Sequence, residues 1–405
     1  MNYCLLRLVD ADCNNNKEYE MTQISNTLFE SSWGRIKGTK MKKTYSMSMW
    51  DKIRQEKLNK GYTDVTRLVS VIKEQERYAC IPDETVRKLV DELLRAANTH
   101  VRNTYNVDKK NVTSLMVSEA QKHIDNMNEF ANQKDCFMFN KEFQQLLLVI
   151  PQKIKNVADV MAKNQNDMPR ICIQQQATLD VLKSLIGNGE TRSKQKEKTN
   201  ENLTILDAFG IEIRPCTDKE ISKIKEKLTK ESDSLLEAAF RIEQKDLESR
   251  YRNYKSNHDI KRTDEHFFWH GTRTENVWSI MKNGMVLNPK AVITGKMFGY
   301  GLYFAPRAKK SINYTSLEGA IYTGGTEKRA YMFVMKVVYK KPYDVYRHNN
   351  AFYTYRNEDI KAHNCDALYA HKGVSLVNDE IIVYDEAQVC PRYLLVLTKD
   401  TKKTA

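Results

Sequence analysis

The sequence lacks most of the features that mark secreted, metal-binding and membrane-spanning proteins. Its eight cysteines stand far apart, with no CxxC pair and no histidine at zinc-finger spacing, so we expect reduced thiols and no bound metal. Its longest apolar runs are as short as Leu146 to Ile150, and the amino terminus carries an early arginine and aspartate, which argues against a membrane span and a signal peptide. We therefore expect an intracellular protein with no membrane partner.

Glycine and proline are also scarce, with 15 and 8 residues among 405, while 41% of the residues are hydrophobic and 29% are charged. Such a composition is typical of folded globular proteins rather than disordered or fibrous ones. A chain of this length predicts two or three domains. The net charge of +13 favours a polyanionic partner such as nucleic acid, because neutralising phosphates releases counterions.

The first half of the chain changes its hydrophobic period near residue 80. Before that point, short runs at strand spacing interrupted by an Asn/Asp cluster predict a small β-rich unit that begins with a hairpin. From Pro82 onward, apolar residues recur at helical spacing. Besides the helix that begins there, we expect helices over residues 114–130, 139–150, 154–161 and 173–186.

The second half follows a segment without apolar residues, GNGETRSKQKEKTNEN at 187–202, which predicts a linker. Beyond it, charged amphipathic patterns predict two helices over about 218–229 and 231–254. Several strands should follow, in the segments EHFFWHG, YGLYFAP, YMFVMKVVY, DALYA and NDEIIVYD.

Three clusters in this second half carry chemistry. The run FFWHGTR ends an expected strand on His270 and Gly271 and adds a hydroxyl and a cation, which suits a ligand with several polar groups. The stretch TGKMFGYGLYFAP, at 294–306, places three glycines before a strand that bears Tyr303. The segment NDEIIVYD puts Glu380 at the start of an apolar strand, where a carboxylate is costly unless something requires it.

Each cluster taken alone also has an ordinary structural explanation. A histidine at a strand end is more often structural, glycines before a strand are usually turn residues, and an acid that opens a strand is usually solvated. The glycine spacing lacks the order of a dinucleotide-binding fingerprint. Metal ligation by His266 and His270 is disfavoured because a strand is expected there.

Taken together, the three clusters closely resemble the poly(ADP-ribose) polymerase family. WHGTRTENVWSIMKNG is similar to its first motif, TGKMFGYGLYFAPRAKKSINY to its glycine-rich NAD loop and the residues after it, and NDEIIVYDEAQVCPRYLLVL to its terminal glutamate strand. Upstream, SSWGR with its surroundings resembles the WGR module that senses DNA breaks. The helices beyond it resemble, more loosely, the family's regulatory helical domain.

The resemblance implies an α+β multidomain protein with a small β-rich WGR domain, an all-helical bundle and a mixed α/β ADP-ribosyltransferase domain with a split antiparallel sheet. The implied boundaries are 1–76 for a DNA-binding WGR domain, 80–186 for the helical regulatory domain, 187–202 for the linker and 203–405 for the catalytic domain.

The resemblance also implies the site residues. The triad would be His270, Tyr303 and Glu380, with Glu380 stabilising the charge that develops on the ribose as nicotinamide leaves. The substrate NAD+ would be bound without a metal, by His270, Gly271, Thr272, Arg273, Asn276, Tyr303, Phe304, Ala305, Ser311 and Tyr314. Contacts with DNA would come from Trp33, Gly34, Arg35, Lys37 and Lys40.

The expected function is a transferase of the DNA damage response. The enzyme would move ADP-ribose from NAD+ to proteins, itself included, extend the polymer, and respond to DNA with strand breaks. A mono-ADP-ribosyltransferase of the same fold and a catalytically inactive DNA-binding scaffold are the alternatives. The protein would act in the nucleus if it is eukaryotic, and in the bacterial cytoplasm or nucleoid if it is a bacterial or phage protein.

Overall fold

The computed structural model describes residues 2–69, 78–107, 111–186, 203–228, 230–287 and 297–399. The predicted linker, 187–202, lies outside the described residues, as do residues 294–296 at the start of the glycine-rich stretch. The chain divides into two compact units. The first holds most described residues up to 186, and the second holds residues 78–97 together with those from 203 onward. Among the residues that the structure describes, every helix is too short or too polar to span a bilayer.

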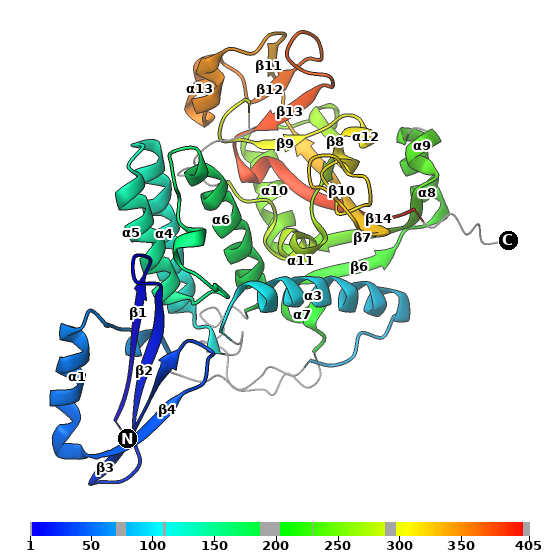
Figure 1. The fold of residues 1–405 in the computed structure, drawn as a ribbon. Coiled ribbons are helices and arrows are strands. Elements are labelled where there is room, and N and C mark those ends of the chain that lie inside the picture. The colour runs from blue at the N-terminus through cyan, green and yellow to red at the C-terminus, as the bar shows by residue number, and fades with distance from the viewer. Residues whose placement is uncertain are drawn as a thin grey trace. The chain divides into compact units, whose positions relative to one another are not determined.

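The first unit contains a five-stranded antiparallel sheet in the order β4-β3-β2-β1-β5, which Figure 1 shows in blue. The predicted amino-terminal hairpin is confirmed, since β1 and β2 pair along their whole lengths. Alternate residues of these strands are buried against α1, as the strand period requires. The elements are β1 (Tyr3–Asp10), β2 (Asn15–Gln23), β3 (Leu28–Arg35), β4 (Met41–Ser46), α1 (Trp50–Asn59), β5 (Thr63–Asp64) and α2 (Thr66–Val69).

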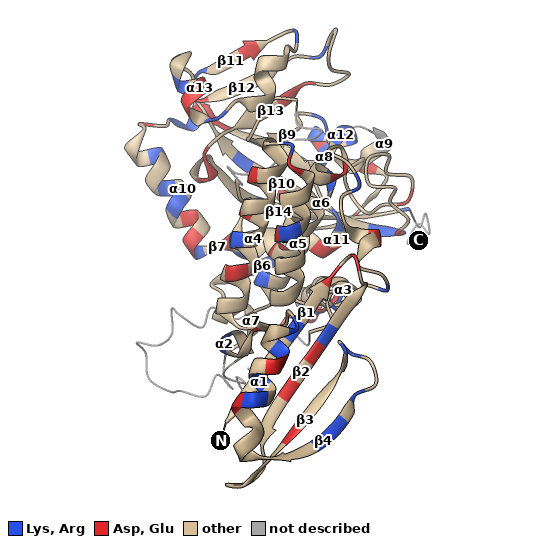
Figure 2. Ribbon diagram, turned by 60° about the vertical axis from the view of Figure 1, so that its left-hand side comes forward, with Lys and Arg blue, Asp and Glu red and all other residues tan. Residues whose placement is uncertain are grey.

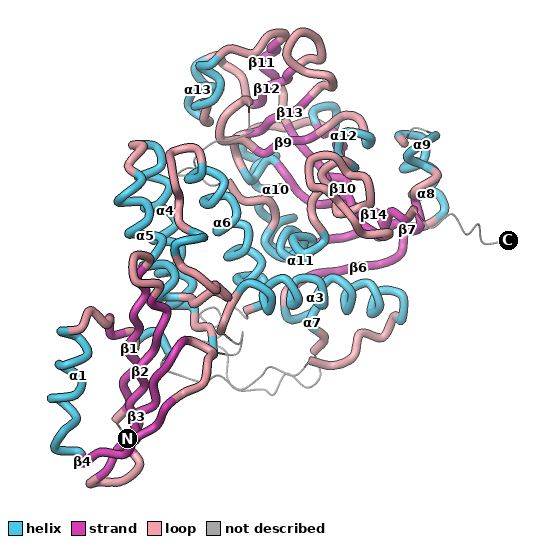
Figure 3. Tube along the Cα trace, in the orientation of Figure 1, coloured by secondary structure: helices cyan, strands magenta, loops and turns pink. Residues whose placement is uncertain are grey.

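Helices and the loops that join them make up the rest of the first unit (Figure 3). Thr113 and Asp135 cap the starts of two of them by accepting hydrogen bonds from main-chain amides. The helices are α4 (Ser114–Asn132), α5 (Cys136–Val149) and α6 (Asp167–Leu185), together with the last residues of α3 (Glu84–Thr104), which belongs to both units.

The predicted helix over residues 154–161 is wrong. Only a 3-10 turn, Ala158–Val160, forms there. The main chain around it is bound elsewhere, since the amide of Lys153 donates to the carbonyl of Thr104 and the amide of Val157 donates to the side chain of Asn14. These tertiary hydrogen bonds replace the helical ones, so the apolar spacing in this stretch reflects packing of a loop.

A buried arginine ties the sheet of the first unit to its helices. Arg7 on β1 is 5% exposed, and its guanidinium donates to the carbonyls of Leu148 and Val149 at the end of α5, at 2.8 and 3.2 Å. These carbonyls are among those that a helix end leaves without internal partners. The β-rich and helical segments therefore pack as one compact unit, and their assignment to separate domains stays a prediction.

The second unit is built on two sheets, one ordered β6-β7-β14-β10-β8 and the other β11-β12-β13-β9. Strand β10 lies between β14 and β8 and is buried along almost its whole length. The strands are β6 (Ile211–Pro215), β7 (Leu236–Gln244), β8 (Glu265–Gly271), β9 (Leu302–Phe304), β10 (Arg329–Val338), β11 (Pro342–Val345), β12 (Ala367–Ala370), β13 (Glu380–Val383) and β14 (Val389–Thr398). The helices are α7 (Ile205–Ala208), α8 (Asp218–Lys227), α9 (Lys230–Asp233), α10 (Lys245–Asn257), α11 (Thr274–Asn283), α12 (Ala308–Ile312) and α13 (Asn357–Ala362).

The two sheets meet where β8 lies beside β9. The main chains of Trp269 and Ala305 exchange two hydrogen bonds, of 3.0 and 3.1 Å, across this point. The sheet is therefore split, as the sequence predicted for the catalytic part. One feature differs from the prediction of an antiparallel sheet, since β11 and β12 run parallel.

The predicted helix over 231–254 is also wrong. Residues 236–244, LEAAFRIEQ, form strand β7 between β6 and β14. The predicted stretch is helical only at its two ends, in the short α9 and from Lys245 onward in α10. Buried and more exposed residues alternate along the second half of β7. Pairing with two neighbouring strands supplies its main chain with partners, and this outweighs the helix propensity of Leu, Glu and Ala.

Helix α3 begins within the second unit. There, Glu92 pairs with Arg329 at the start of β10, and Arg329 also pairs with Glu237 on β7 at 2.9 Å. All three side chains keep more than a third of their surface exposed. Ion pairs of this kind contribute less than about 1 kcal/mol each.

Candidate active site

The end of β8 lies against β9 at the point where the two sheets meet. His270 is one residue beyond the Trp269 bridge, and its Nδ1 lies 3.3 Å from the carbonyl oxygen of Tyr303. Because a carbonyl oxygen only accepts, Nδ1 is the protonated nitrogen that donates. Two residues that are 33 positions apart in the sequence are thereby adjacent, as the predicted triad requires.

The hydroxyl of Tyr303 holds the glycine-rich segment in place. It accepts a hydrogen bond from the amide of Phe298 and donates to the carbonyl of Gly299, each at 3.0 Å. Burial raises the pKa of Tyr303 far above its usual value, so the phenol stays neutral at any physiological pH. Gly299 has a φ of 77°, and a Cβ there would lie 2.2 Å from the carbonyl oxygen of Tyr355, which explains why glycine is required.

Glu380 begins β13, the strand between β12 and β9, as predicted. The strand register sets Ile381 and Ile382 opposite Phe304 and Tyr303. This pairing brings the carboxylate to the same end of the split sheet as Tyr303. The exposed fraction of the Glu380 side chain is only 14%.

Lys310 on α12 is the partner of that carboxylate, and sequence reasoning missed it. Its ammonium forms an ion pair with Glu380, and its side chain is 11% exposed. A largely buried charge is costly without such a partner. The sequence feature that could have revealed Lys310 is its position directly before Ser311, which was among the predicted site residues.

Gly271 and Ser311 show how closely α12 approaches the end of β8. A Cβ on Gly271 would lie 1.7 Å from the carbonyl oxygen of Ser311, so only glycine fits at this position. Ser311 itself is 3% exposed. The sequence had suggested that the glycine lets a ligand reach the main chain, and the approach of α12 adds a second, purely structural reason.

Other predicted ligand residues are distributed around this point. Thr272 is buried and its hydroxyl accepts a hydrogen bond from the side-chain Nδ2 of Asn276 at 3.3 Å, while the guanidinium of Arg273 donates to the carbonyl of Thr323 at 2.8 Å. The side chains of Phe304 and Ala305 are buried, which leaves their main chains as the groups suited to contact a ligand.

Tyr314 remains 40% exposed beside these residues. Its ring stacks on Tyr322, with centroids 4.6 Å apart. Burial, with the negative charge of Glu380 as a second cause, raises the pKa of Tyr314 to about 12. Tyr314 therefore lies near the carboxylate and is neutral at physiological pH.

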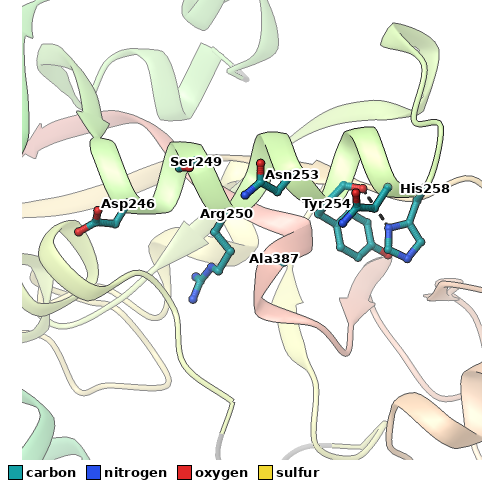
Figure 4. Close-up of a pocket in the computed structure, with 8 residues that line it drawn as sticks. Asp246, Ser249, Arg250, Asn253, Tyr254, His258 and Ala387 are labelled. Atoms are coloured by element: carbon teal, nitrogen blue, oxygen red, sulfur yellow. Dashed lines mark hydrogen bonds between the residues drawn. The ribbon is translucent and has the colours of Figure 1, made fainter.

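A separate cavity of about 460 Å³ follows the exposed face of α10 (Figure 4). Its lining includes Arg250, Asn253 and the stacked rings of Tyr254 and His258. Every side chain of the predicted site lies outside this lining. Arg250 is already paired with Glu386 at 3.1 Å, so the cavity offers no unpaired cation to an anionic ligand.

The residues predicted to contact DNA lie in the first unit, where Lys and Arg colour α1 and β4 blue in Figure 2. Trp33 stacks on Tyr19 at 5.6 Å and packs partly against the core. Arg35 donates to the carbonyls of Asn14 and Lys155.

Two lysines follow this arginine in the same predicted contact surface. Lys40 pairs with Glu18 at 2.9 Å, whereas Lys37 is exposed and has a φ of 59°. Gly34 leaves no room for a side chain, because a Cβ would lie 2.5 Å from the carbonyl oxygen of Thr39. Of these residues, Lys37 is therefore the most exposed to a partner.

The cysteines and other metal-ligating groups are dispersed in the structure. All eight cysteines are free thiols. Across the described ranges, no three His, Cys, Asp or Glu side chains gather closely enough to bind a metal ion.

Comparison with known proteins identifies the second unit. Residues 218–399 match the model of the poly(ADP-ribose) polymerase catalytic domain. A 204-residue stretch is 30% identical to uncharacterized protein 101L of Invertebrate iridescent virus 6, covering 50% of this chain and 84% of that protein. A shorter stretch of 132 residues is 26% identical to the putative poly [ADP-ribose] polymerase-like protein 100L of the same virus, covering 32% of this chain and 69% of that protein.

Cellular enzymes match over smaller regions. Poly [ADP-ribose] polymerase 1 of Gallus gallus is 41% identical over 76 residues, which are 18% of this chain and 7% of that enzyme. The poly [ADP-ribose] polymerase of Sarcophaga peregrina is 28% identical over 173 residues, which are 38% of this chain and 17% of that enzyme. The match with these two enzymes therefore spans less than a fifth of their length.

The matched residues 218–399 include all three sequence motifs, and residues of these motifs meet where the two sheets join. A domain of this kind uses NAD+ as its substrate. The chain contains a poly(ADP-ribose) polymerase catalytic domain and is an NAD+-dependent ADP-ribosyltransferase.

Proposed function

We propose that the enzyme transfers ADP-ribose from NAD+ to proteins, itself included, and extends it as a polymer when DNA carries strand breaks. The observation that carries this proposal is the largely buried Glu380 carboxylate, paired with Lys310, on the strand beside Tyr303. Breaking the bond between nicotinamide and ribose develops positive charge on the ribose, which a fixed carboxylate stabilises. Lys310 engages Oε1 of Glu380, and we assign Oε2 to the hydroxyl groups of the substrate ribose.

The remaining residues would bind and orient NAD+. We assign the main chain of Gly271 and the hydroxyl of Ser311 to the nicotinamide amide, and the rings of Tyr303 and Tyr314 to its two faces. His270 would contact the adenosine ribose through Nε2. Its Nδ1 donates to the carbonyl of Tyr303, and this hydrogen bond fixes the ring orientation.

Activation by DNA is the part of the proposal that concerns the first unit. The net charge of +13 and the lysines and arginines of α1 and β4 support an electrostatic attraction to DNA. We assign the contact surface to Trp33, Gly34, Arg35, Lys37 and Lys40. Because Arg35 and Lys40 have partners within the protein, Lys37 is expected to contribute most to phosphate binding.

The experiment is an incorporation assay with labelled NAD+, run with nicked duplex, intact duplex and no DNA. We expect labelled protein, strongly stimulated by the nick, and products of many lengths on a denaturing gel. Incorporation that the nick does not change would refute activation by DNA. Products carrying a single ADP-ribose would refute the polymer and favour the mono-ADP-ribosyltransferase.

The role of Lys37 can be tested in the same assay. Lys37→Ala should raise the DNA concentration needed for half-maximal stimulation and leave the stimulated rate at saturating DNA unchanged, because phosphate contacts position DNA without taking part in the reaction. A suitable control is Lys134→Ala, since Lys134 also has a positive φ and lies in a turn of the same unit. Equal behaviour of the two variants would remove Lys37 from the contact surface.

A further inference from the structure

The loop between α12 and β10, residues 313–328, folds back on itself beside the candidate site. The amide of Tyr322 donates to the carbonyl of Asn313 at 3.1 Å, and the amide of Glu327 donates to the carbonyl of Ser316 at 2.9 Å. Gly325 packs so closely that a Cβ would lie 2.2 Å from the carbonyl oxygen of Leu317. Main-chain contacts within the loop therefore help to fix its shape.

The same loop is fastened to the HGTR motif at the end of β8. The guanidinium of Arg273 donates to the carbonyl of Thr323 at 2.8 Å. The hydroxyl of Thr274 donates to the carboxylate of Glu327 at 2.7 Å, and its amide donates to the hydroxyl of Ser316 at 3.0 Å. The end of β8 and the residues that follow α12 are thus joined through one loop.

The loop carries two tyrosines, Tyr314 of the candidate site and Tyr322, whose rings contact each other. The two rings lie at an interplanar angle of 30°. Tyr322 is 62% exposed and Tyr314 keeps 40% of its surface exposed. Tyr314 is thus covered by a second ring and still offers surface to a ligand.

We propose that Tyr322 is a positioning residue, which holds the ring of Tyr314 in the orientation that stacks on nicotinamide. This inference rests on the proposed function, because that function assigns Tyr314 to the wall of the nicotinamide site. Stacked aromatic pairs prefer an offset arrangement of defined geometry, so the ring of Tyr322 restricts the torsion angles available to Tyr314. A ligand then meets a ring that is already ordered, and less entropy is lost on binding.

A role in the stability of the fold does not account for Tyr322. Most of its ring is exposed, so its removal uncovers little apolar surface. The hydrogen bonds that shape the loop come from main-chain groups and from side chains other than that of Tyr322, among them Arg273, Thr274, Ser316 and Glu327. The loop should therefore keep its fold when the ring is removed.

The test measures the binding of benzamide, a small analogue of nicotinamide, to the full-length protein by calorimetry. We expect Tyr322→Ala to weaken benzamide binding about two- to tenfold, the range that corresponds to one aromatic stack. Tyr322→Phe should restore it, because the ring and not the hydroxyl does the positioning. In turnover assays the KM for NAD+ should rise by a similar factor, with a smaller change in kcat.

Tyr346→Ala is the matched control, since Tyr346 is 68% exposed and stacks on His371 at 4.3 Å in the same unit. It should leave benzamide binding unchanged. Binding unchanged by Tyr322→Ala would overturn the inference, and tighter binding would do so too, because Tyr322 would then cover the face that the ligand needs. A protein that makes no polymer but loses benzamide affinity on Tyr322→Ala would support the inference and refute the polymerase proposal separately.

Discussion

Replacing Glu380 and Lys310 singly and together tests the ion pair at the centre of the candidate site. The two side chains are 14% and 11% exposed, so neither charge is well solvated if its partner is removed. Breaking a buried pair costs about 3 to 5 kcal/mol, because an uncompensated charge remains. Since both side chains retain some exposure, we expect Glu380→Gln and Lys310→Met each to lower the free energy of unfolding by about 2 kcal/mol or more.

The double variant should behave differently in stability and in catalysis. With both charges removed, the free energy of unfolding should return to within about 1 kcal/mol of the unmodified protein. Catalysis should not return. The carboxylate that stabilises the developing charge is absent, and we expect kcat to fall by about 10²- to 10³-fold in every variant without Glu380.

Calorimetric unfolding of the full chain and the NAD+ incorporation assay together provide the measurement. A change of 2 kcal/mol should shift the unfolding midpoint of the catalytic unit by about 4 to 8 °C. Lys336→Met is the matched control, since Lys336 forms an equally buried pair with Glu248, with side chains 9% and 10% exposed. It should lower the midpoint and leave most of the kcat.

Three results would refute this reasoning. If the single changes left the midpoint unaltered, the pair would not be an energetically coupled one. If the double variant were no more stable than Glu380→Gln, the loss would come from some other feature of the glutamate. Activity that survived Glu380→Gln would remove the carboxylate from the proposed mechanism.

Three further predictions follow from single contacts. Gly271→Ala should lower the free energy of unfolding by about 3 kcal/mol or more and abolish benzamide binding, because the new Cβ collides with the carbonyl of Ser311. A variant that binds benzamide normally in calorimetry would contradict this prediction. Tyr303→Phe should lower the free energy of unfolding by about 1 to 3 kcal/mol, since it leaves the amide of Phe298 and the carbonyl of Gly299 without their partner. An unchanged midpoint in a denaturant titration would contradict this prediction. The hydrogen bonds of Arg214 to Glu220 lower the pKa of that carboxyl to about 2. The ionised carboxylate therefore stabilises the fold above pH 4.5, and this contribution is lost as the pH falls towards 2. The Glu220→Gln variant should lose less stability than the unmodified protein over that pH range.

Much of the candidate site could be predicted from the sequence because its chemistry follows local patterns. His270 and Glu380 stand at strand ends in the structure, as their apolar neighbours predicted. The prediction that Tyr303 lies on the strand after the glycines is confirmed by β9. The spacing of apolar residues and the preferences of turn residues depend on only a few neighbours along the chain. They can therefore be recognised in a single sequence.

The errors lie where distant segments compete for the main chain. The stretch LEAAFRIEQ has helical composition but forms β7, because β6 and β14 offer it hydrogen-bonding partners on both sides. Residues 154–161 lose their predicted helix because the amide of Lys153, just before them, binds Thr104 and that of Val157 binds Asn14. In both cases the hydrogen-bonding partners lie in distant parts of the chain, so the segment's own sequence does not reveal them.

The sequence by itself determined which chemical groups this enzyme has and the order in which they come, since motif, charge and strand period depend only on neighbouring residues. Only the tertiary structure decided that Lys310 neutralises Glu380, that Tyr322 covers Tyr314, and that α12 leaves no room beside Gly271. Each of these contacts depends on how the sheets and the loop after α12 pack together. A local pattern carries no information on such packing, because burial and contact are properties of the whole fold.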